Sequence, residues 1–191
     1  MMLDHASLEQ ALQTLGEILA ARGEHHDLAV VGGGALLILG LIDRPTRDLD
    51  VVARVDAGGW SRAEPFPPGL LDAVRDVATA LDLSEDWLNP GPTDLLALGL
   101  PAGFSNRVVV RRYGALTVRF AAREDQIAFK LYAAVDQGPD SKHFADLQKL
   151  SPTPDELLAA ARWTRTHDPS EGFRSMLHQA LRALGVEPAD V

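Results

Sequence analysis

A run of three glycines between two apolar segments constrains the fold of this 191-residue chain more than any other feature. Residues 27–31 (DLAVV) predict a short buried strand, and Gly32, Gly33 and Gly34 end it. The apolar residues 35–42 (ALLILGLI) then predict a buried helix. Glycines at such a turn let an anion approach the backbone, and the first amides of the helix point toward it. The segment is therefore either a structural turn or a phosphate-binding turn.

Two aspartates, Asp48 and Asp50, stand at the start of the next apolar segment, 49–55 (LDVVARV), which predicts a second strand. Because alternate residues of a strand point to the same face, we expect the two carboxylates to lie side by side. Neighbouring carboxylates repel each other unless a cation lies between them. Mg²⁺ suits such a pair, because it takes a few carboxylate oxygens and shares its other positions with water and substrate phosphates. The alternative is that both are solvated acids at the start of a strand.

The loop before this strand carries Arg44, Thr46 and Arg47, which add groups able to bind phosphate. A dinucleotide-binding unit is a weaker interpretation of the same region. Its glycine fingerprint fails at Leu37, and its acidic residue would end the second strand instead of preceding the apolar run. A P-loop is excluded because the chain has no Gly-Lys-Ser/Thr sequence.

The rest of the chain predicts an α+β fold, with a small mixed β-sheet flanked by helices and a helical C-terminal part. Apolar periodicity predicts helices over 6–22, 69–81, 124–136, 142–150, 154–166 and 171–184, and a hairpin over 107–112 and 115–120 that turns at Tyr113-Gly114. Residues 58–68 and 89–92 are predicted to be loops or turns. The predicted domains are an α/β core over 1–123 and a helical region over 124–191 that closes the cleft.

Composition limits the classes of function. The chain has no cysteine, no apolar run long enough to cross a membrane, and no basic start leading into an apolar run, so we expect a cytoplasmic protein without a membrane partner. The net charge of −9 argues against bulk binding to nucleic acid. However, the segment 107–123 holds five arginines and no acid. These arginines are either a solvated strand face or a local surface for an anionic partner.

The arrangement of Val31-Gly32-Gly33, a short helix and then Arg44-Pro45-Thr46-Arg47-Asp48-Leu49-Asp50 resembles motif I of the DNA polymerase β-like nucleotidyltransferase superfamily. Within it, the chain is most similar to minimal enzymes of the AbiEii/MenT toxin type. The resemblance implies that the glycines contact the phosphates of an NTP. It also implies that Asp48 and Asp50 bind Mg²⁺ or Mn²⁺.

A second segment, 124–147 (EDQIAFKLYAAVDQGPDSKHFADL), is similar to the later family pattern, in which a helical lysine precedes a Lys/Arg-x-x-x-Asp-Leu element. The resemblance implies that Lys130 contacts the nucleotide phosphates and that Asp146 is a further acid near the active site. From the residues alone, Lys130 is equally a surface lysine. Asp146 then forms an exposed ion pair with Lys142, four residues earlier.

One position departs from the family pattern. Many polymerase β-like enzymes carry a third carboxylate on a later strand, where this chain has Arg119. The AbiEii-type group often lacks that acid, so its absence does not exclude catalysis. It leaves the general base open between Asp146 and one carboxylate of the Asp48–Asp50 pair.

Together these observations predict a magnesium-dependent nucleotidyltransferase that moves a nucleoside monophosphate from an NTP to an acceptor hydroxyl. The resemblance favours the 3′ end of a tRNA or another RNA as acceptor, and a toxin with a cognate antitoxin protein as partner. The alternative is a catalytically degenerate module of the same fold that binds a nucleotide or a partner without transfer. The missing strand acid favours this alternative.

Overall fold

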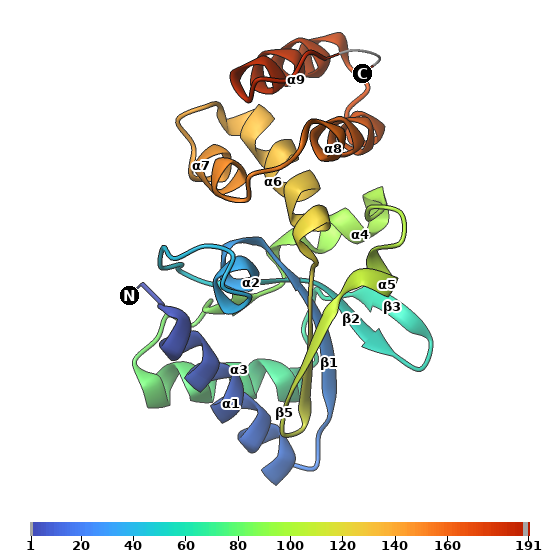
Figure 1. Cartoon of the computed structure of the whole chain (residues 1–191). Helices are drawn as coiled ribbons and strands as arrows, with labels where there is room; N and C mark the ends of the chain where they lie inside the picture. Colours follow the sequence, from blue (N-terminus) through green and yellow to red (C-terminus); the bar gives the residue numbers. More distant parts are fainter. Residues whose placement is uncertain (1, 189–190) are drawn as a thin grey trace. The chain divides into compact units, whose positions relative to one another are not determined.

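The computed structural model describes residues 2–188 and 191, and it has the predicted α+β class, with 53% helix and one mixed sheet. The chain divides into two compact units, Met1–Ala121 and Ala122–Val191. The first unit contains the sheet, and the second consists of helices (Figure 1). Among the described residues, no helix combines the length and the apolar character needed to cross a bilayer.

The centre of the first unit is a six-stranded mixed sheet. Its strands are β1 (His26–Val31), β2 (Leu49–Asp56), β3 (Gly59–Arg62), β4 (Leu88–Asn89), β5 (Val109–Tyr113) and β6 (Leu116–Phe120). The order is β3-β2-β1-β6-β5, and the short β4 pairs with the start of β2. Strand β1 runs antiparallel to β2 and parallel to β6. It is therefore central and almost fully buried, from Leu28 to Val31.

The helices of the first unit cover the sheet. They are α1 (His5–Ala21), α2 (Gly32–Ile38), α3 (Pro68–Leu81), α4 (Asp94–Leu98) and α5 (Phe104–Arg107), with a 3₁₀ turn, η1 (Gly91–Thr93). Helix α1 begins at a cap in which the Asp4 carboxylate accepts a hydrogen bond from the Ser7 amide at 2.8 Å. Its leucines at helical spacing are fully buried, and it lies against α3 (Figure 1).

Helix α1 also approaches the β5–β6 hairpin closely at Gly16. A Cβ atom at this position would overlap the carbonyl group of Tyr113. The Gly16 carbonyl in turn accepts a hydrogen bond from the Ala115 amide at 3.3 Å. The lack of a side chain at Gly16 therefore allows the helix backbone to touch the turn of the hairpin.

The structure corrects several predicted boundaries. The buried helix begins at Gly32, three residues before its predicted start at residue 35, and ends at Ile38. The β5–β6 hairpin turns at Gly114-Ala115, because Tyr113 pairs with Leu116. The predicted loop over 58–68 contains β3, which pairs with β2 across an Ala57-Gly58 turn. Four short elements between residues 59 and 107, namely β3, β4, α4 and α5, were not predicted.

The second unit contains α6 (Arg123–Gln137), α7 (Lys142–Lys149), α8 (Pro154–His167) and α9 (Glu171–Ala183). These bounds agree with the predicted helices to within one residue. Helix α6 contacts each of the other three. Ser141, Thr153 and Ser170 cap the starts of α7, α8 and α9, and Thr153 forms a capping box with Glu156. Edge-to-face and tilted ring contacts join α6, α8 and α9 through Phe129, Tyr132, Trp163, His167 and Phe173.

Replacement of Gly16 tests the contact between α1 and the hairpin. We expect Gly16→Ala to lower the free energy of unfolding by about 1–3 kcal/mol, because overpacking outweighs the better helix propensity of alanine. Gly172→Ala in α9 is the matched control, since a Cβ there meets no atom within 4 Å. The control should raise stability by about 0.5 kcal/mol. Urea unfolding followed by circular dichroism measures both, and an unchanged Gly16→Ala variant contradicts the packing argument.

Candidate functional site

The glycine turn and the Asp48–Asp50 segment lie against each other in the first unit. Val31, the last residue of β1, is opposite Asp50 in the antiparallel register with β2. The chain therefore turns into α2 directly beside Asp50. A Cβ atom on Gly32 would lie 2.6 Å from Oδ2 of Asp50, and Gly32 has a φ of +78°. Only glycine meets both conditions without strain.

The next two glycines face the loop that leads into β2. A Cβ on Gly33 would lie 3.2 Å from Nη2 of Arg44 and 3.3 Å from Oγ1 of Thr46. A Cβ on Gly34 would lie 2.6 Å from the carbonyl oxygen of Asp48, which is closer than real Cβ atoms come to a backbone oxygen. The structure thus brings together most of the site residues predicted in the first half of the chain.

Thr46 and Arg44 face the glycines, and they also hold the loop before β2 in place. The buried Thr46 hydroxyl donates to the carbonyl of Asp48 at 3.2 Å. The backbone of Thr46 pairs with that of Leu3, with N–O distances of 2.6 and 2.9 Å. The Arg44 guanidinium donates to the carbonyl of Pro45 at 3.3 Å. These contacts hold the loop in a defined conformation next to the glycine turn.

Asp48 and Asp50 are both half-buried, and they stand on either side of Leu49, the buried first residue of β2. Asp48 also lines a surface hollow of about 510 Å³ with Met2, Arg47, Ser84 and Asp86. The Ser84 hydroxyl donates to the Asp86 carboxylate within this hollow. Sequence reasoning missed Ser84 and Asp86. No motif marks them, since they belong to a polar loop between α3 and β4.

The donor set fits a hard divalent cation better than a soft one. The chain has no thiolate, and among the described residues no three His, Asp or Glu side chains gather into a metal-binding group. Two carboxylates are the usual protein share of a Mg²⁺ site, because this ion keeps water and phosphate oxygens as its other ligands. The Asp50 carboxylate lies against the backbone of Gly32, where it occupies the space that a Cβ would need. Asp48 and Asp50 are thus the residues able to hold such an ion.

Lys130 and Asp146 form a buried ion pair in the second unit. The Lys130 ammonium on α6 lies 2.7 Å from Oδ2 of Asp146 on α7, and the two side chains are only 4% and 2% exposed. One of the two interpretations that the residues alone left open, a surface lysine and an exposed Asp146–Lys142 pair, is therefore wrong. The reason is that α6 and α7 face each other through these two charges, while Lys142 stays exposed. That Lys130 and Asp146 act together with Asp48 and Asp50 stays a prediction.

The arginines of segment 107–123 are mostly engaged within the protein. Arg119 on β6 holds Asp27 on β1 through two hydrogen bonds of 2.8 and 2.7 Å, and these raise the pKa of Arg119 above its usual value. Arg111 lies 2.6 Å from the carboxylate of Glu9.

At the end of the segment, Arg123 binds Glu156 at 2.5 Å and the carbonyl of Leu150. Arg112 is the exposed member of the group. The segment is therefore neither the fully solvated face nor the uniform anion-binding surface that the sequence suggested.

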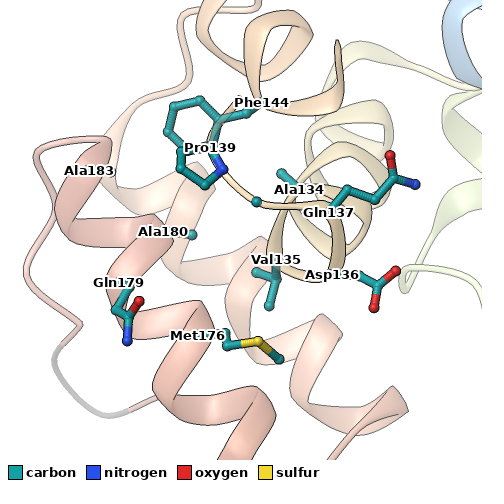
Figure 2. A pocket seen from close by; sticks show the side chains of 11 residues that line it. Ala134, Val135, Asp136, Gln137, Pro139, Phe144, Met176, Gln179, Ala180 and Ala183 are labelled. Carbon is teal, nitrogen blue, oxygen red and sulfur yellow. The ribbon is translucent and has the colours of Figure 1, made fainter. Parts of the chain in front are cut away.

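A separate apolar cavity of about 320 Å³ lies in the second unit, and Figure 2 shows its lining. Val135 on α6, Phe144 on α7 and Met176 on α9 contribute to it. None of the predicted site residues lines this cavity, and its lining includes no lysine or arginine to bind a phosphate. It is therefore not the candidate site.

Comparisons of the chain with protein-family models, with curated protein sequences and with solved structures find no match. The fold and the site therefore define the chain only as an α+β protein with a glycine turn packed beside an Asp-x-Asp pair.

Replacement of the buried pair tests how strongly it ties α6 to α7. We expect Lys130→Met and Asp146→Asn each to lower the free energy of unfolding by about 3–5 kcal/mol, since each removes one charge of a buried ion pair and leaves the opposite charge buried. The double variant should lose clearly less than the sum of the two. Lys142→Met, at an exposed position four residues before Asp146, is the control and should change stability by less than about 0.5 kcal/mol. Additive losses in urea unfolding would show that the two charges are not coupled.

Proposed function

We propose that this protein is a magnesium-dependent nucleotidyltransferase that transfers a nucleoside monophosphate from an NTP to an acceptor hydroxyl. One observation carries the proposal: the Asp50 carboxylate lies against Gly32, since a Cβ built there would be 2.6 Å from Oδ2 of Asp50. A triphosphate at the glycine turn is then within reach of the carboxylates that hold its cation. The resemblance to the polymerase β-like superfamily supports the same assignment.

The proposed reaction breaks one phosphoanhydride bond and forms one phosphoester bond. The acceptor oxygen attacks the α-phosphorus, the bond from that phosphorus to the bridging oxygen breaks, and pyrophosphate leaves. Asp48 and Asp50 would hold the Mg²⁺ ion, which would supply charge neutralisation at the phosphates. The glycine turn positions the phosphates, while Arg44 and Arg47 neutralise charge that develops on them.

The acceptor proton needs a base, and the geometry narrows the choice. Asp146 is 2% exposed and is held by Lys130, so an acceptor hydroxyl has poor access to it. We therefore assign to Asp146 the role of holding the Lys130 ammonium in place through their ion pair. Proton acceptance falls to Asp48 or Asp50, which are half-buried and accessible.

The resemblance favours an RNA 3′ end and a toxin role with a cognate antitoxin. The arginines of segment 107–123 are a weak argument for an RNA-binding surface. Three of them, Arg111, Arg119 and Arg123, already have carboxylate partners. The 3′ end of an RNA is therefore the first acceptor to test, and a protein or small-molecule hydroxyl is the second.

A nucleotide- or partner-binding module without transfer activity is the second candidate. Arg119 favours it, because a strand position that holds a third carboxylate in many polymerase β-like enzymes here holds an arginine bound to Asp27. A positive charge at that position cannot accept a proton from the acceptor.

Labelled NTPs separate the two candidates. The purified protein is incubated with each α-³²P-labelled NTP, Mg²⁺ and either total RNA or cell extract, and the macromolecular fractions are examined for label. We expect label to appear in one fraction, and Asp48→Ala and Asp50→Ala each to reduce transfer by about 10²- to 10³-fold or more. Asp72→Ala, at an exposed acid on α3, should leave transfer unchanged.

The same samples test the binding module. Stabilisation of the protein by NTP and Mg²⁺ in thermal unfolding, with no labelled product in any fraction, would replace transfer with binding as the function. The absence of both label and stabilisation would reject both candidates.

A further inference from the structure

The apolar cavity of the second unit, formed by α6, α7 and α9, has the size of a small-molecule site (Figure 2). Val135 and Phe144 in its lining are buried, whereas Met176 is 44% exposed and belongs to its rim. Its volume of about 320 Å³ is at the lower end of the range of roughly 300–1,000 Å³ that is typical of ligand pockets. The cavity therefore suits a compact molecule better than a helix or a strand of a partner.

The charge of the lining indicates the kind of molecule. Among the described lining residues, one side chain is charged, and it is the carboxylate of Asp136 at the end of α6. Asp136 is exposed, and within residues 2–188 and 191 it forms no ion pair. Lys142 and Arg182, which follow nearby in the sequence, are outside the lining. The carboxylate is therefore available to a cation at the rim of an apolar cavity.

The ends of the helices favour the same sign of charge. Helix α6 ends at Gln137 and α9 ends at Ala183, and both residues line the cavity. The last carbonyl groups of a helix give its C-terminus a partial negative charge. Helix α7 begins beside the cavity, but the Phe144 amide already donates to the Ser141 hydroxyl at 3.2 Å. The backbone thus attracts a cation more than an anion.

We propose that this cavity binds a small organic cation, namely an ammonium group on a hydrocarbon or aromatic body. The body packs on Val135 and Phe144, and the flexible Met176 thioether adapts to its shape. The ammonium group stays at the rim beside Asp136. Because exposed charge pairs contribute little, the apolar body supplies most of the affinity and Asp136 supplies the preference for a cation. The site shares no residue with the glycine turn or with Asp48 and Asp50, so it is independent of the nucleotidyltransferase proposal.

Three probes with nearly the same body test the proposal on the full-length protein. They are 2-phenylethylammonium, the neutral 2-phenylethanol and the anionic phenylacetate. The chain has three methionines, so ¹³C-methyl labelling gives few signals, and Met176→Leu identifies the signal of Met176. We expect 2-phenylethylammonium to shift this signal with a dissociation constant below about 5 mM. The alcohol should bind about threefold more weakly and phenylacetate at least about fivefold more weakly.

Two pairs of variants separate the charge from the cavity. Asp136→Asn should make the ammonium and the alcohol bind equally while the alcohol keeps its affinity, which also shows that the variant is folded. Asp140→Asn, at an exposed acid outside the lining, is the control and should keep the preference. Ala180→Leu fills the cavity and should abolish the shifts by both probes. Ser175→Leu, at an exposed position of α9 outside the lining, should leave them unchanged.

Four outcomes would overturn the proposal. The first is the absence of any shift of the Met176 methyl signal at about 20 mM of each probe. The second is equal binding of the three probes, which would leave an apolar cavity without preference for charge. The third is an unchanged preference in Asp136→Asn. The fourth is a concentration-dependent dimer of the protein alone that Ala180→Leu abolishes in sedimentation, since a second copy would then occupy the cavity.

Discussion

The close contact between the backbone of α2 and the start of β2 is the constraint on which the candidate site depends. The register of β1 with β2 sets Val31 opposite Asp50, so the chain must turn immediately beside a carboxylate. Gly32 makes this turn with a φ of +78°, and Gly34 lets α2 rest on the Asp48 carbonyl. A side chain at either position would displace the acid segment or separate helix from strand. The same contact therefore closes the core at this end of the sheet and sets the half-buried Gly32 beside Asp50.

The long elements were predictable from the sequence because each has several repeats of its hydrophobic period. The helices of the second unit are examples, as are β1 and β2. The elements that were missed contain only two to five residues, too few for a period to be visible. The start of α2 was misplaced for a different reason. Glycine has a low intrinsic helix propensity, but at Gly34 the contact with β2 excludes every larger residue, so tertiary packing decides the local structure.

Some features of the candidate site were likewise predictable from the sequence, and others were not. The glycines and the two aspartates were predicted to form one site, and the structure places the Asp50 carboxylate beside Gly32 and the Asp48 carbonyl beside Gly34. The ion pairs were not predictable, because their partners are distant in the sequence. Arg119 and Asp27 are 92 residues apart, and Arg111 and Glu9 are 102 apart. A run of arginines in the sequence thus indicates available charge, and only the fold decides how much of it is already neutralised.

This neutralisation bears on how an acidic protein could bind a triphosphate. The net charge is −9, so the long-range field repels an anionic ligand. Within the first unit, Arg111 and Arg119 are held by carboxylates. Arg44 lies beside Gly33, and Arg47 lines the hollow with Asp48. Asp48 and Asp50 add two negative charges in the adjoining segment. On the proposed function, a triphosphate can then approach this turn only together with a divalent cation that offsets both sets of charges. Nucleotide binding and metal binding are therefore a single event at this site, and a nucleotide that bound equally well without the metal would require a different site.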